Sequence, residues 1–410
     1  MLRNYHKIYG IKPILKSMMK IDDWKALKPV DILFVVHDFN RTYRYKDKAY
    51  SPLLDSLQET YLKNGYSCLT IASPFSQLTK KHTFGEVIDF NGSFFRAAIF
   101  RILRNIINKE ELSGTRYIKD VWRKILSGTS PRQVITIHPS ASLCSACRDQ
   151  GIDISDFQHG VINDGHPAYG EAYKRNCENA VLPTSFLCWD NIAVTTLEKW
   201  TKKKGIRVDL ISNPWTQRFI NNDPYDELVS EARASYSWLL ILPKRKRILV
   251  TLGWGWDEIT DEVLSEKFNM MVTMPQFLSF PIPILDVIRE THETIIWFIR
   301  SHPTQIKGIE RIPLENFLSK HFDDLPNVFW KEVANTPLTI LLESTDLHIT
   351  VNSTITSEAA IFGIQTGLIA PVPRPVTYLQ SYYEIERQNG IAEFVPNSSE
   401  DILKFIKNNL

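Results

Sequence analysis

The sequence predicts an α/β protein with two doubly wound halves. Short, continuous apolar runs, which are typical of buried parallel strands, alternate with amphipathic segments of helical spacing. The alternation fills residues 30–213 and begins again at residue 246, after a charged and poorly periodic stretch at 214–245. Polar residues suited to binding or catalysis follow several strands in both halves. We therefore expect two Rossmann-like domains that face a cleft, with ligands at the carboxyl ends of the strands.

In the first half, a glycine follows the last periodic residue of three expected helices, as is common at helix ends. These glycines are Gly65, Gly151 and Gly205. The expected strands lie at 31–36, 67–72, 133–137, 153–157, 186–189 and 208–211. The expected helices lie at 51–63, 94–108, 117–126, 140–150 and 191–204.

The second half repeats the pattern. Its expected strands lie at 247–252, 294–299, 327–330 and 347–351, followed by a short apolar run that ends at Pro371. Its expected helices lie at 284–293, 314–321, 336–343, in the segment after Thr354, and from 399 to the end. We consider it an option that the last helices pack back onto the first domain.

The composition is that of a globular protein, with 43% hydrophobic and 23% charged residues in 410. The net charge of +2 does not favour nucleic acid as a partner. Five scattered cysteines do not form a disulfide framework and fit a reducing cytoplasm; we interpret Cys144 and Cys147 as packing residues. The sequence shows neither a signal peptide nor an apolar run near the roughly 18 residues of a spanning helix, so we expect a cytoplasmic protein.

Residues 1–29 form a basic leader, with seven Lys or Arg residues against two Asp. One interpretation is solvated surface. The other is attraction to the anionic inner face of the cytoplasmic membrane, worth about 1 kcal/mol per basic residue near that surface. The leader is followed by domains at 30–213 and 246–410, with 214–245 as the connection.

Polar residues at strand ends of the second half predict a site for an anionic ligand. Arg300 and His302 follow a fully apolar strand and offer donors to a phosphate, and Pro303 restricts the turn beside them. Asn352, Ser353 and Thr354 precede a helix start, which suits a phosphate, although an ordinary helix cap explains them equally well. Glu358 lies in the first turn of that helix. The remaining candidates are Gly253, Trp254 and Gly255, where the backbone approaches a ligand closely or simply makes a tight turn.

The first half offers a general base. His159 follows an apolar strand, between Gln158 and a glycine, and a neutral imidazole is suited to activate a hydroxyl near neutral pH. Asp156, three residues earlier, is the expected orienting group. The loop that follows is dense in polar groups and either lines the cleft or is exposed surface. The candidate acceptor contacts are Gln158 beside His159, Asp164 and His166 in that loop, and His37, Asp38 and Arg41 after the first strand. No paired-aspartate motif follows a strand, so we expect neither a metal nor a cofactor and assign stabilisation of the leaving phosphate to the second-half donors.

With these residues, the chain resembles GT-B glycosyltransferases of bacterial surface-polysaccharide biosynthesis, and among them the sialyltransferase-like and Kdo-transferase-like enzymes that use CMP-sugars. His302-Pro303 matches their HP motif, and Ser353-Thr354 matches their Ser/Thr motif. Their first-domain motif ends in glycine and carries the base, which is a carboxylate in the sialyltransferase relatives. Here the corresponding residues are Gln158-His159-Gly160, so the sequence departs from that pattern.

The resemblance implies a metal-independent transferase that moves an acidic sugar, of the nonulosonic acid or Kdo type, from a CMP-sugar to a hydroxyl of a glycan or lipid-linked acceptor. Capsule and lipopolysaccharide are the products that such enzymes build. It implies that 246–410 binds the nucleotide sugar and that 30–213 binds the acceptor. The alternative is a transferase or epimerase that uses a UDP- or GDP-sugar. A third hypothesis is a non-catalytic binding protein of polysaccharide assembly.

Overall fold

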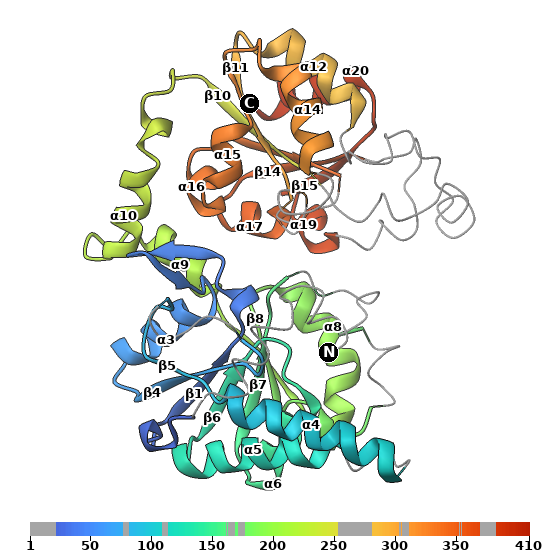
Figure 1. Cartoon of the computed structure of the whole chain (residues 1–410). Helices are drawn as coiled ribbons and strands as arrows, with labels where there is room; N and C mark the ends of the chain where they lie inside the picture. The colour runs from blue at the N-terminus through green and yellow to red at the C-terminus, as the bar shows by residue number, and fades with distance from the viewer. Residues whose placement is uncertain are drawn as a thin grey trace. The chain divides into compact units, whose positions relative to one another are not determined.

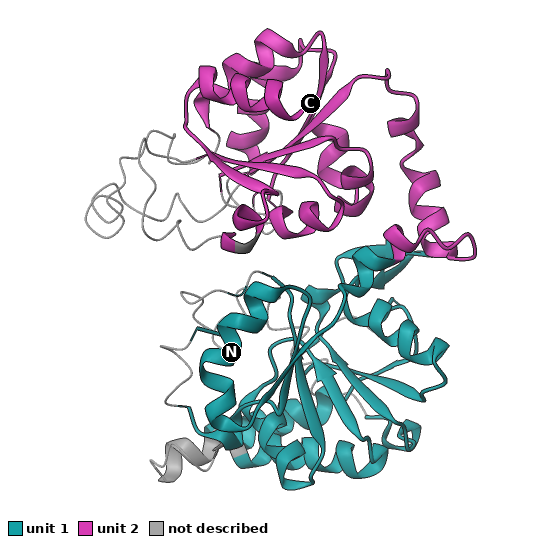
Figure 2. Cartoon of the chain, turned by 180° about the vertical axis from the view of Figure 1, so that it is seen from behind, with its two compact units in different colours: residues 1–217 teal, residues 218–410 magenta. Residues whose placement is uncertain are grey.

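The structure, a computed structural model, divides the chain into two compact units, residues 1–217 and residues 218–410 (Figure 2). The division falls inside the segment predicted as a connection. The described residues are 22–76, 82–108, 114–160, 162, 169–170, 177–252, 281–302, 305, 311–351, 353, 355–369 and 383–410. The early part of the predicted leader and residues 253–280 lie outside these ranges.

Unit 1 is built on a parallel sheet of seven strands in the order β5-β4-β1-β6-β7-β8-β9 (Figure 1). The winding reverses next to the first strand, so β1 and β6 flank the switch point where ligands of such sheets bind. The strands are β1 (Ile32–Val36), β4 (Cys68–Ala72), β5 (Val87–Ile88), β6 (Gln133–Thr136), β7 (Asp153–Phe157), β8 (Ser185–Cys188) and β9 (Arg207–Leu210).

Helices cover both faces of this sheet, which explains the continuous apolar runs in its sequence. Leu33 and Val35 of β1 pack in the core with residues of α4, α5 and α6, whereas Phe34 and Val36 pack with Leu54 of α3. The helices of unit 1 are α3 (Leu54–Lys63), α4 (Asn91–Asn108), α5 (Gly114–Thr129), α6 (Ala141–Asp149) and α8 (Asn191–Thr201). Short 3-10 turns are η1 (Trp24–Ala26), η2 (Asp38–Asn40), η3 (Asn179–Val181) and η4 (Lys202–Lys204).

Unit 2 has a parallel sheet of six strands in the order β12-β11-β10-β13-β14-β15. Its switch point lies between β10 and β13, as between β1 and β6 in unit 1. The strands are β10 (Lys246–Thr251), β11 (Ile295–Arg300), β12 (Val328–Phe329), β13 (Leu347–Thr350), β14 (Gln365–Ile369) and β15 (Ala392–Val395). The helices are α12 (Ile282–Thr291), α14 (Arg311–Phe322), α15 (Lys331–Asn335), α16 (Leu338–Glu343), α17 (Ile355–Ile361), α19 (Glu384–Gln388) and α20 (Ser399–Asn409).

The last helix, α20, contributes one face to the core of unit 2. Ile402, Phe405 and Ile406 of α20 are buried with residues of α12 and β15. They are spaced as one apolar face, and that face is covered within unit 2.

Most predicted elements are present, with ends that differ by a few residues. The predicted connection contains helices, α9 (Pro214–Asn221) and α10 (Glu227–Ser235), and the 3-10 turn η5 (Ser237–Leu240). Sequence analysis missed the hairpin of β2 (Tyr43–Tyr45) and β3 (Lys48–Tyr50), and also β5, β15 and α19, which are too short for a clear period. The interpretation of Cys144 and Cys147 as packing residues is confirmed, since neither forms a disulfide and both are fully buried in the core of unit 1. No helix in the described ranges is long and apolar enough to cross a bilayer.

Candidate functional site

In unit 1, the loop after β6 holds His138 in an unusual backbone conformation. Its φ of 52° lies in the left-handed region, which a side chain other than glycine adopts at a cost of about 1–3 kcal/mol. The buried Asp156 carboxylate of the neighbouring strand β7 accepts the His138 backbone N–H at 2.9 Å. β6 and β7 pair in register with Thr136 opposite Asp156, which places the carboxylate beside the loop. This hydrogen bond stabilises the turn that presents His138 at the carboxyl edge.

His138 joins two further rings. Its ring stacks on Tyr169, with centroids 5.2 Å apart, and its Nδ1 lies 3.2 Å from the tyrosine hydroxyl. The His159 ring approaches the His138 ring edge-on at 4.4 Å. Both histidines are exposed, whereas Tyr169 is buried. Burial raises the pKa of Tyr169, and the Asp156 carboxylate beside it raises that pKa further, so the tyrosine keeps its proton. The result is a pair of exposed histidines that is supported by the buried side chains of Tyr169 and Asp156.

Asp156 has a role that the sequence did not predict. It holds the backbone of His138 and contacts Tyr169. Its expected role of orienting His159 stays a prediction. His138 was absent from the predicted site, although its signal was the same as that of His159: a histidine directly after an apolar strand. Only the pairing of β6 with β7 brings the two histidines together.

Gln158 is not available as an acceptor contact, because its side chain is buried and fully engaged. The amide nitrogen donates to Asp190 at 2.5 Å and to the Gly160 carbonyl at 2.9 Å, and the amide oxygen accepts the Trp189 N–H at 2.9 Å. Gln158 therefore ties the loop that carries His159 to the end of β8. The expected contact is corrected to a positioning role.

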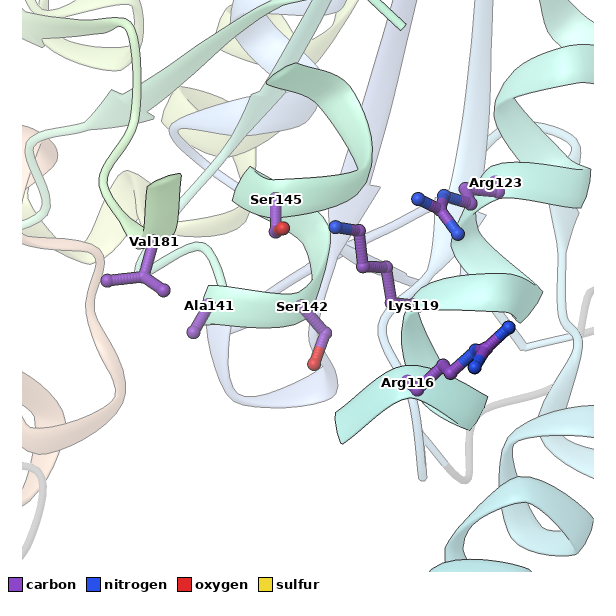
Figure 3. Close-up of a pocket in the computed structure, with 7 residues that line it drawn as sticks. All are labelled: Arg116, Lys119, Arg123, Ala141, Ser142, Ser145 and Val181. Carbon is purple, nitrogen blue, oxygen red and sulfur yellow. The ribbon is translucent and has the colours of Figure 1, made fainter. Parts of the chain in front are cut away.

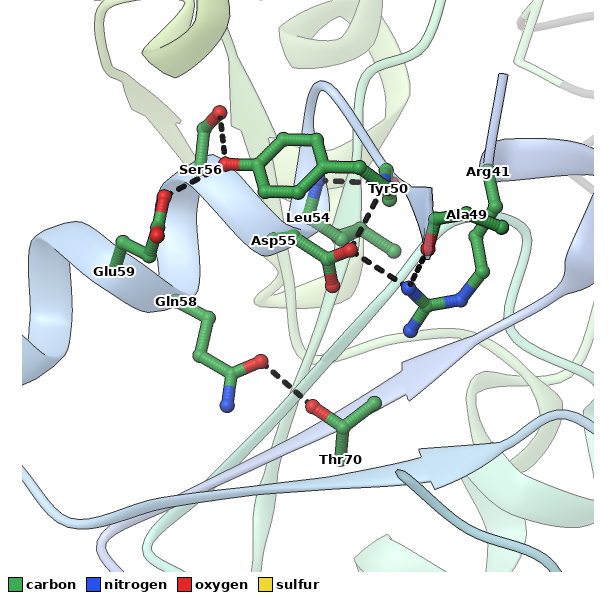
Figure 4. Close-up of polar contacts among 10 residues, drawn as sticks. Arg41, Ala49, Tyr50, Leu54, Asp55, Ser56, Gln58, Glu59 and Thr70 are labelled. Atoms are coloured by element: carbon green, nitrogen blue, oxygen red, sulfur yellow. Dashed lines mark hydrogen bonds and ion pairs between the residues drawn. The ribbon is translucent and has the colours of Figure 1, made fainter. Parts of the chain in front are cut away.

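The prediction that Arg41 contacts an acceptor is also corrected. Its guanidinium is buried, donates to the Asp55 carboxylate at 2.7 Å and to the Ala49 carbonyl at 3.0 Å, and so fixes the β2–β3 hairpin to α3 (Figure 4). His37 caps η2, with its Nδ1 accepting the Phe39 N–H at 3.2 Å. Asp38 lies in the same turn and is partly exposed. The Arg41–Asp55 pair is structural, because a buried cation is stable only where a carboxylate pairs with it. The acceptor contacts expected of His37 and Asp38 stay predictions.

In unit 2, Arg300 and Glu358 lie at the carboxyl edge of the sheet. Arg300 ends β11, and Glu358 stands in the first turn of α17, which follows β13; the end of β10 lies between these two strands. Nη1 of Arg300 donates to the carbonyls of Val333 at 3.0 Å and Thr336 at 2.6 Å. The Arg300 guanidinium and the Glu358 carboxylate also interact electrostatically.

Both groups have strongly shifted pKa values. Burial raises the pKa of Glu358 to about 7, although Arg300 opposes this, and it lowers the pKa of Arg300 to about 10. Each side chain keeps some accessible surface, but dense protein on its other sides disfavours the charged form. Shifted pKa values at a strand edge are typical of functional sites.

Two other predicted donors, His302 and Ser353, follow β11 and β13 at the same edge of the sheet. His302 is half-buried, which lowers its pKa, and its backbone N–H donates to Gln305 at 2.8 Å. The Ser353 hydroxyl accepts the Ile355 N–H at 3.3 Å, as in an ordinary turn before a helix, and the Ser353 carbonyl accepts from the Tyr383 hydroxyl. The predicted residues outside the described ranges are Gly253, Trp254, Gly255, Pro303, Asn352, Thr354, Asp164 and His166.

A third histidine, His348, is completely buried in β13. Its Nε2 lies 2.8 Å from the Thr251 hydroxyl of β10, and its Nδ1 lies 3.0 Å from the Thr366 hydroxyl of β14. Burial lowers its pKa to about 3, so it is neutral at physiological pH. His348 therefore joins three strands beneath the edge and does not face a ligand.

Within the described ranges, no group of three or more His, Cys, Asp or Glu side chains is arranged to hold a metal ion. The absence of a metal requirement stays a prediction.

No protein-family model matches the sequence, and no curated protein resembles it. Solved structures with a similar fold include UDP-GlcNAc 2-epimerase from Methanocaldococcus jannaschii, at 15% identity and a TM-score of 0.54 over 92% of this chain and 91% of that one. The enzyme of that name from Neisseria meningitidis, bound to UDP-GlcNAc, has 15% identity and a TM-score of 0.55 over 92% and 90%. The wall teichoic acid polymerase TagF has 14% identity and a TM-score of 0.50 over 100% and 86%. At this identity the likeness shows the fold, which is the predicted GT-B class of two Rossmann-like units.

Proposed function

We propose that this chain is a GT-B enzyme that acts on a nucleotide sugar in surface-polysaccharide biosynthesis. The observation that carries the proposal is the Arg300–Glu358 pair, two charges with shifted pKa values at the switch point of a Rossmann-like sheet. Such an edge is where α/β sheets bind nucleotides. Unit 2 holds the nucleotide, with Glu358 accepting from a ribose hydroxyl and with Arg300 and His302 near the phosphates.

The donor in this proposal is a UDP-sugar. Solved structures of similar fold include a UDP-GlcNAc 2-epimerase bound to UDP-GlcNAc and an MnaA–UDP complex. They favour the alternative of the sequence analysis over a CMP-sugar, for which no comparison gives support.

Unit 1 supplies the proton acceptor. His159 is exposed, as a general base must be, and its ring is held edge-on against His138. In a transfer, His159 takes the proton of the acceptor hydroxyl as that oxygen bonds to the anomeric carbon. As this bond forms, the bond from the anomeric carbon to the phosphate oxygen of the nucleotide breaks, and the nucleoside diphosphate leaves.

A nucleotide screen tests the proposal. We expect UDP to raise the melting temperature of the full chain more than CMP or GDP does, since a ligand stabilises the state that binds it. Glu358→Gln is expected to weaken UDP binding, with Glu343→Gln as a control on the exposed side of α16. If no nucleotide stabilises the protein, the proposal is wrong; if CMP alone does, the CMP-sugar hypothesis replaces the UDP one.

Epimerisation is the second candidate, because several solved structures of similar fold are UDP-GlcNAc 2-epimerases. Epimerisation breaks and remakes a C–H bond of the sugar, so it incorporates solvent deuterium without an acceptor. A transferase releases UDP only when an acceptor hydroxyl is present. Mass spectrometry of UDP-GlcNAc incubated with the protein in D₂O separates these reactions.

A further inference from the structure

A basic cavity lies between two helices on the outer layer of unit 1. It has a volume of about 460 Å³, within the range of small-molecule sites. Helix α5 contributes Arg116, Lys119 and Arg123, which share one face because they are spaced by three and four residues. The facing wall is formed by Ala141, Ser142 and Ser145 of α6 and by Val181 of η3. Figure 3 shows the Lys119 side chain extending from α5 toward α6.

The charges of this cavity are only partly balanced. Lys119 is 2.7 Å from the Asp149 carboxylate, which also pairs with Arg123, and Asp120 pairs with Arg123 at 3.1 Å. These hydrogen bonds lower the pKa of Asp149, so the carboxylate stays charged and holds both cations in place. Arg116 makes no ion pair or hydrogen bond with any described residue. Three cations against two carboxylates leave a net positive charge.

The wall formed by α6 offers two neutral donors, the hydroxyls of Ser142 and Ser145. Larger side chains at these positions would fill the cavity. The hydroxyls of Ser142 and Ser145 are half-buried and make no hydrogen bond to the described part of the chain. Their neighbours Cys144 and Cys147 point into the core, so the serines are left on the outer face of α6. Serine hydroxyls opposite Lys and Arg are a donor set suited to phosphate oxygens.

The cavity adjoins the histidine pair. Val181 lines both this cavity and a smaller one of about 80 Å³, which His138 and Asp156 also line. Arg148 fixes the intervening wall by donating to the carbonyls of Leu182 at 2.9 Å and Pro183 at 2.8 Å. A molecule with its anionic group between α5 and α6 therefore extends past Val181 toward the edge that carries His138.

We propose that this cavity binds the phosphate group of a phosphorylated saccharide, which is the acceptor of the enzyme. The assignment as acceptor rests on the proposed function. The binding of a sugar phosphate does not, since it follows from the cavity, its cations and its serines alone.

The test is isothermal titration calorimetry of the full chain with glucose 6-phosphate and, separately, inorganic phosphate. We expect saturable binding of glucose 6-phosphate. Arg116→Gln combined with Lys119→Gln should weaken it at least about tenfold, because the variant loses charge-assisted hydrogen bonds to the phosphate. Ser145→Leu should abolish it by filling the cavity without changing the charge. The matched control, Lys202→Gln with Lys203→Gln, removes two exposed cations on the same unit and should leave the affinity within about twofold.

Absence of binding to the wild-type chain would overturn the proposal, as would an equal loss in the control. Sedimentation with phosphatidylcholine vesicles containing phosphatidylglycerol is the second arm. If the Arg116/Lys119 variant loses vesicle binding while glucose 6-phosphate does not bind, the cations serve a lipid surface and the proposal is wrong. UDP titration of the same variants keeps the two proposals separate, because UDP binding in unit 2 should be unchanged whatever the cavity binds.

Discussion

The two units have the same strand order around their switch points. The histidines near these points, however, lie in opposite environments. In unit 1, His138 and His159 are exposed at the carboxyl edge, and the buried Tyr169 and Asp156 lie behind them. In unit 2, His348 lies under the edge, locked between two threonine hydroxyls. The exposed pair can exchange protons with solvent, whereas the buried ring stays neutral at physiological pH. The difference teaches that a histidine near a strand end is a base only where the fold leaves its ring in water.

The charged pairs differ in the same way. Arg41 and Asp55 in unit 1 form a direct and buried ion pair that fixes a hairpin. Arg300 in unit 2 is held by two backbone carbonyls, and its interaction with Glu358 leaves that carboxylate with a pKa near neutrality. The Arg41–Asp55 pair is a direct contact inside the fold, whereas we propose that the Arg300–Glu358 pair contacts a ligand.

The largest expected effect concerns the exposed histidines. His159→Ala should lower turnover by about 10²–10⁴-fold with the fold intact, because general-base catalysis contributes about that much. Initial rates of UDP release and a circular dichroism spectrum measure the two properties. The control is His321→Ala in α14, a partly exposed ring that contacts Arg289. Near-normal turnover in His159→Ala would show that His159 is not the general base.

The next effect concerns the buried pair of unit 1. Asp55→Ala should destabilise the protein by about 3–5 kcal/mol, since it leaves the Arg41 guanidinium buried without its carboxylate. Combining Arg41→Met with Asp55→Leu should restore much of this loss. Urea denaturation measures the stability of the single and the double variant. The control is Asp209→Ala, which removes an exposed pair with Arg207 and should cost about 0–1 kcal/mol. A loss of less than about 1 kcal/mol in Asp55→Ala contradicts the structural role of the pair.

A loss of comparable size is expected in the core of unit 2. His348→Val leaves the hydroxyls of Thr251 and Thr366 without the imidazole, at about 1–3 kcal/mol for each buried group left unsatisfied. Urea denaturation should show this loss, while the nucleotide-binding constant per folded molecule stays close to wild type. If binding is lost in a folded variant, His348 contributes to the ligand site and the contrast between the histidines fails.

The smallest effect is a pH dependence from Glu358. Its folded pKa of about 7 exceeds the ordinary value of 4.5, so the folded state holds the proton more tightly than the unfolded state does. The favourable contribution is present below the ordinary pKa and is lost as the pH rises through about 7. Glu358→Gln should therefore flatten the fall in stability between pH 5 and 8, as measured by urea midpoints. Asp55, with a pKa raised to about 6, contributes a fall of the same sign that the variant retains. Equal slopes in the two proteins would show that Glu358 is not shifted.

The sequence by itself determined the α/β class, the two halves and the strand ends where polar residues gather. These features are local, because apolar runs and helix-end glycines depend on neighbours in the chain. It also identified Arg300, Glu358 and His159 as residues at those ends. The tertiary structure decided which of the candidates face solvent. The side chains of Gln158 and Arg41 are buried, and the His138 ring lies against the His159 ring. Three cations of α5 line one cavity with two serines of α6. Each of these outcomes depends on strand register and helix packing between segments far apart in sequence, which no local pattern records.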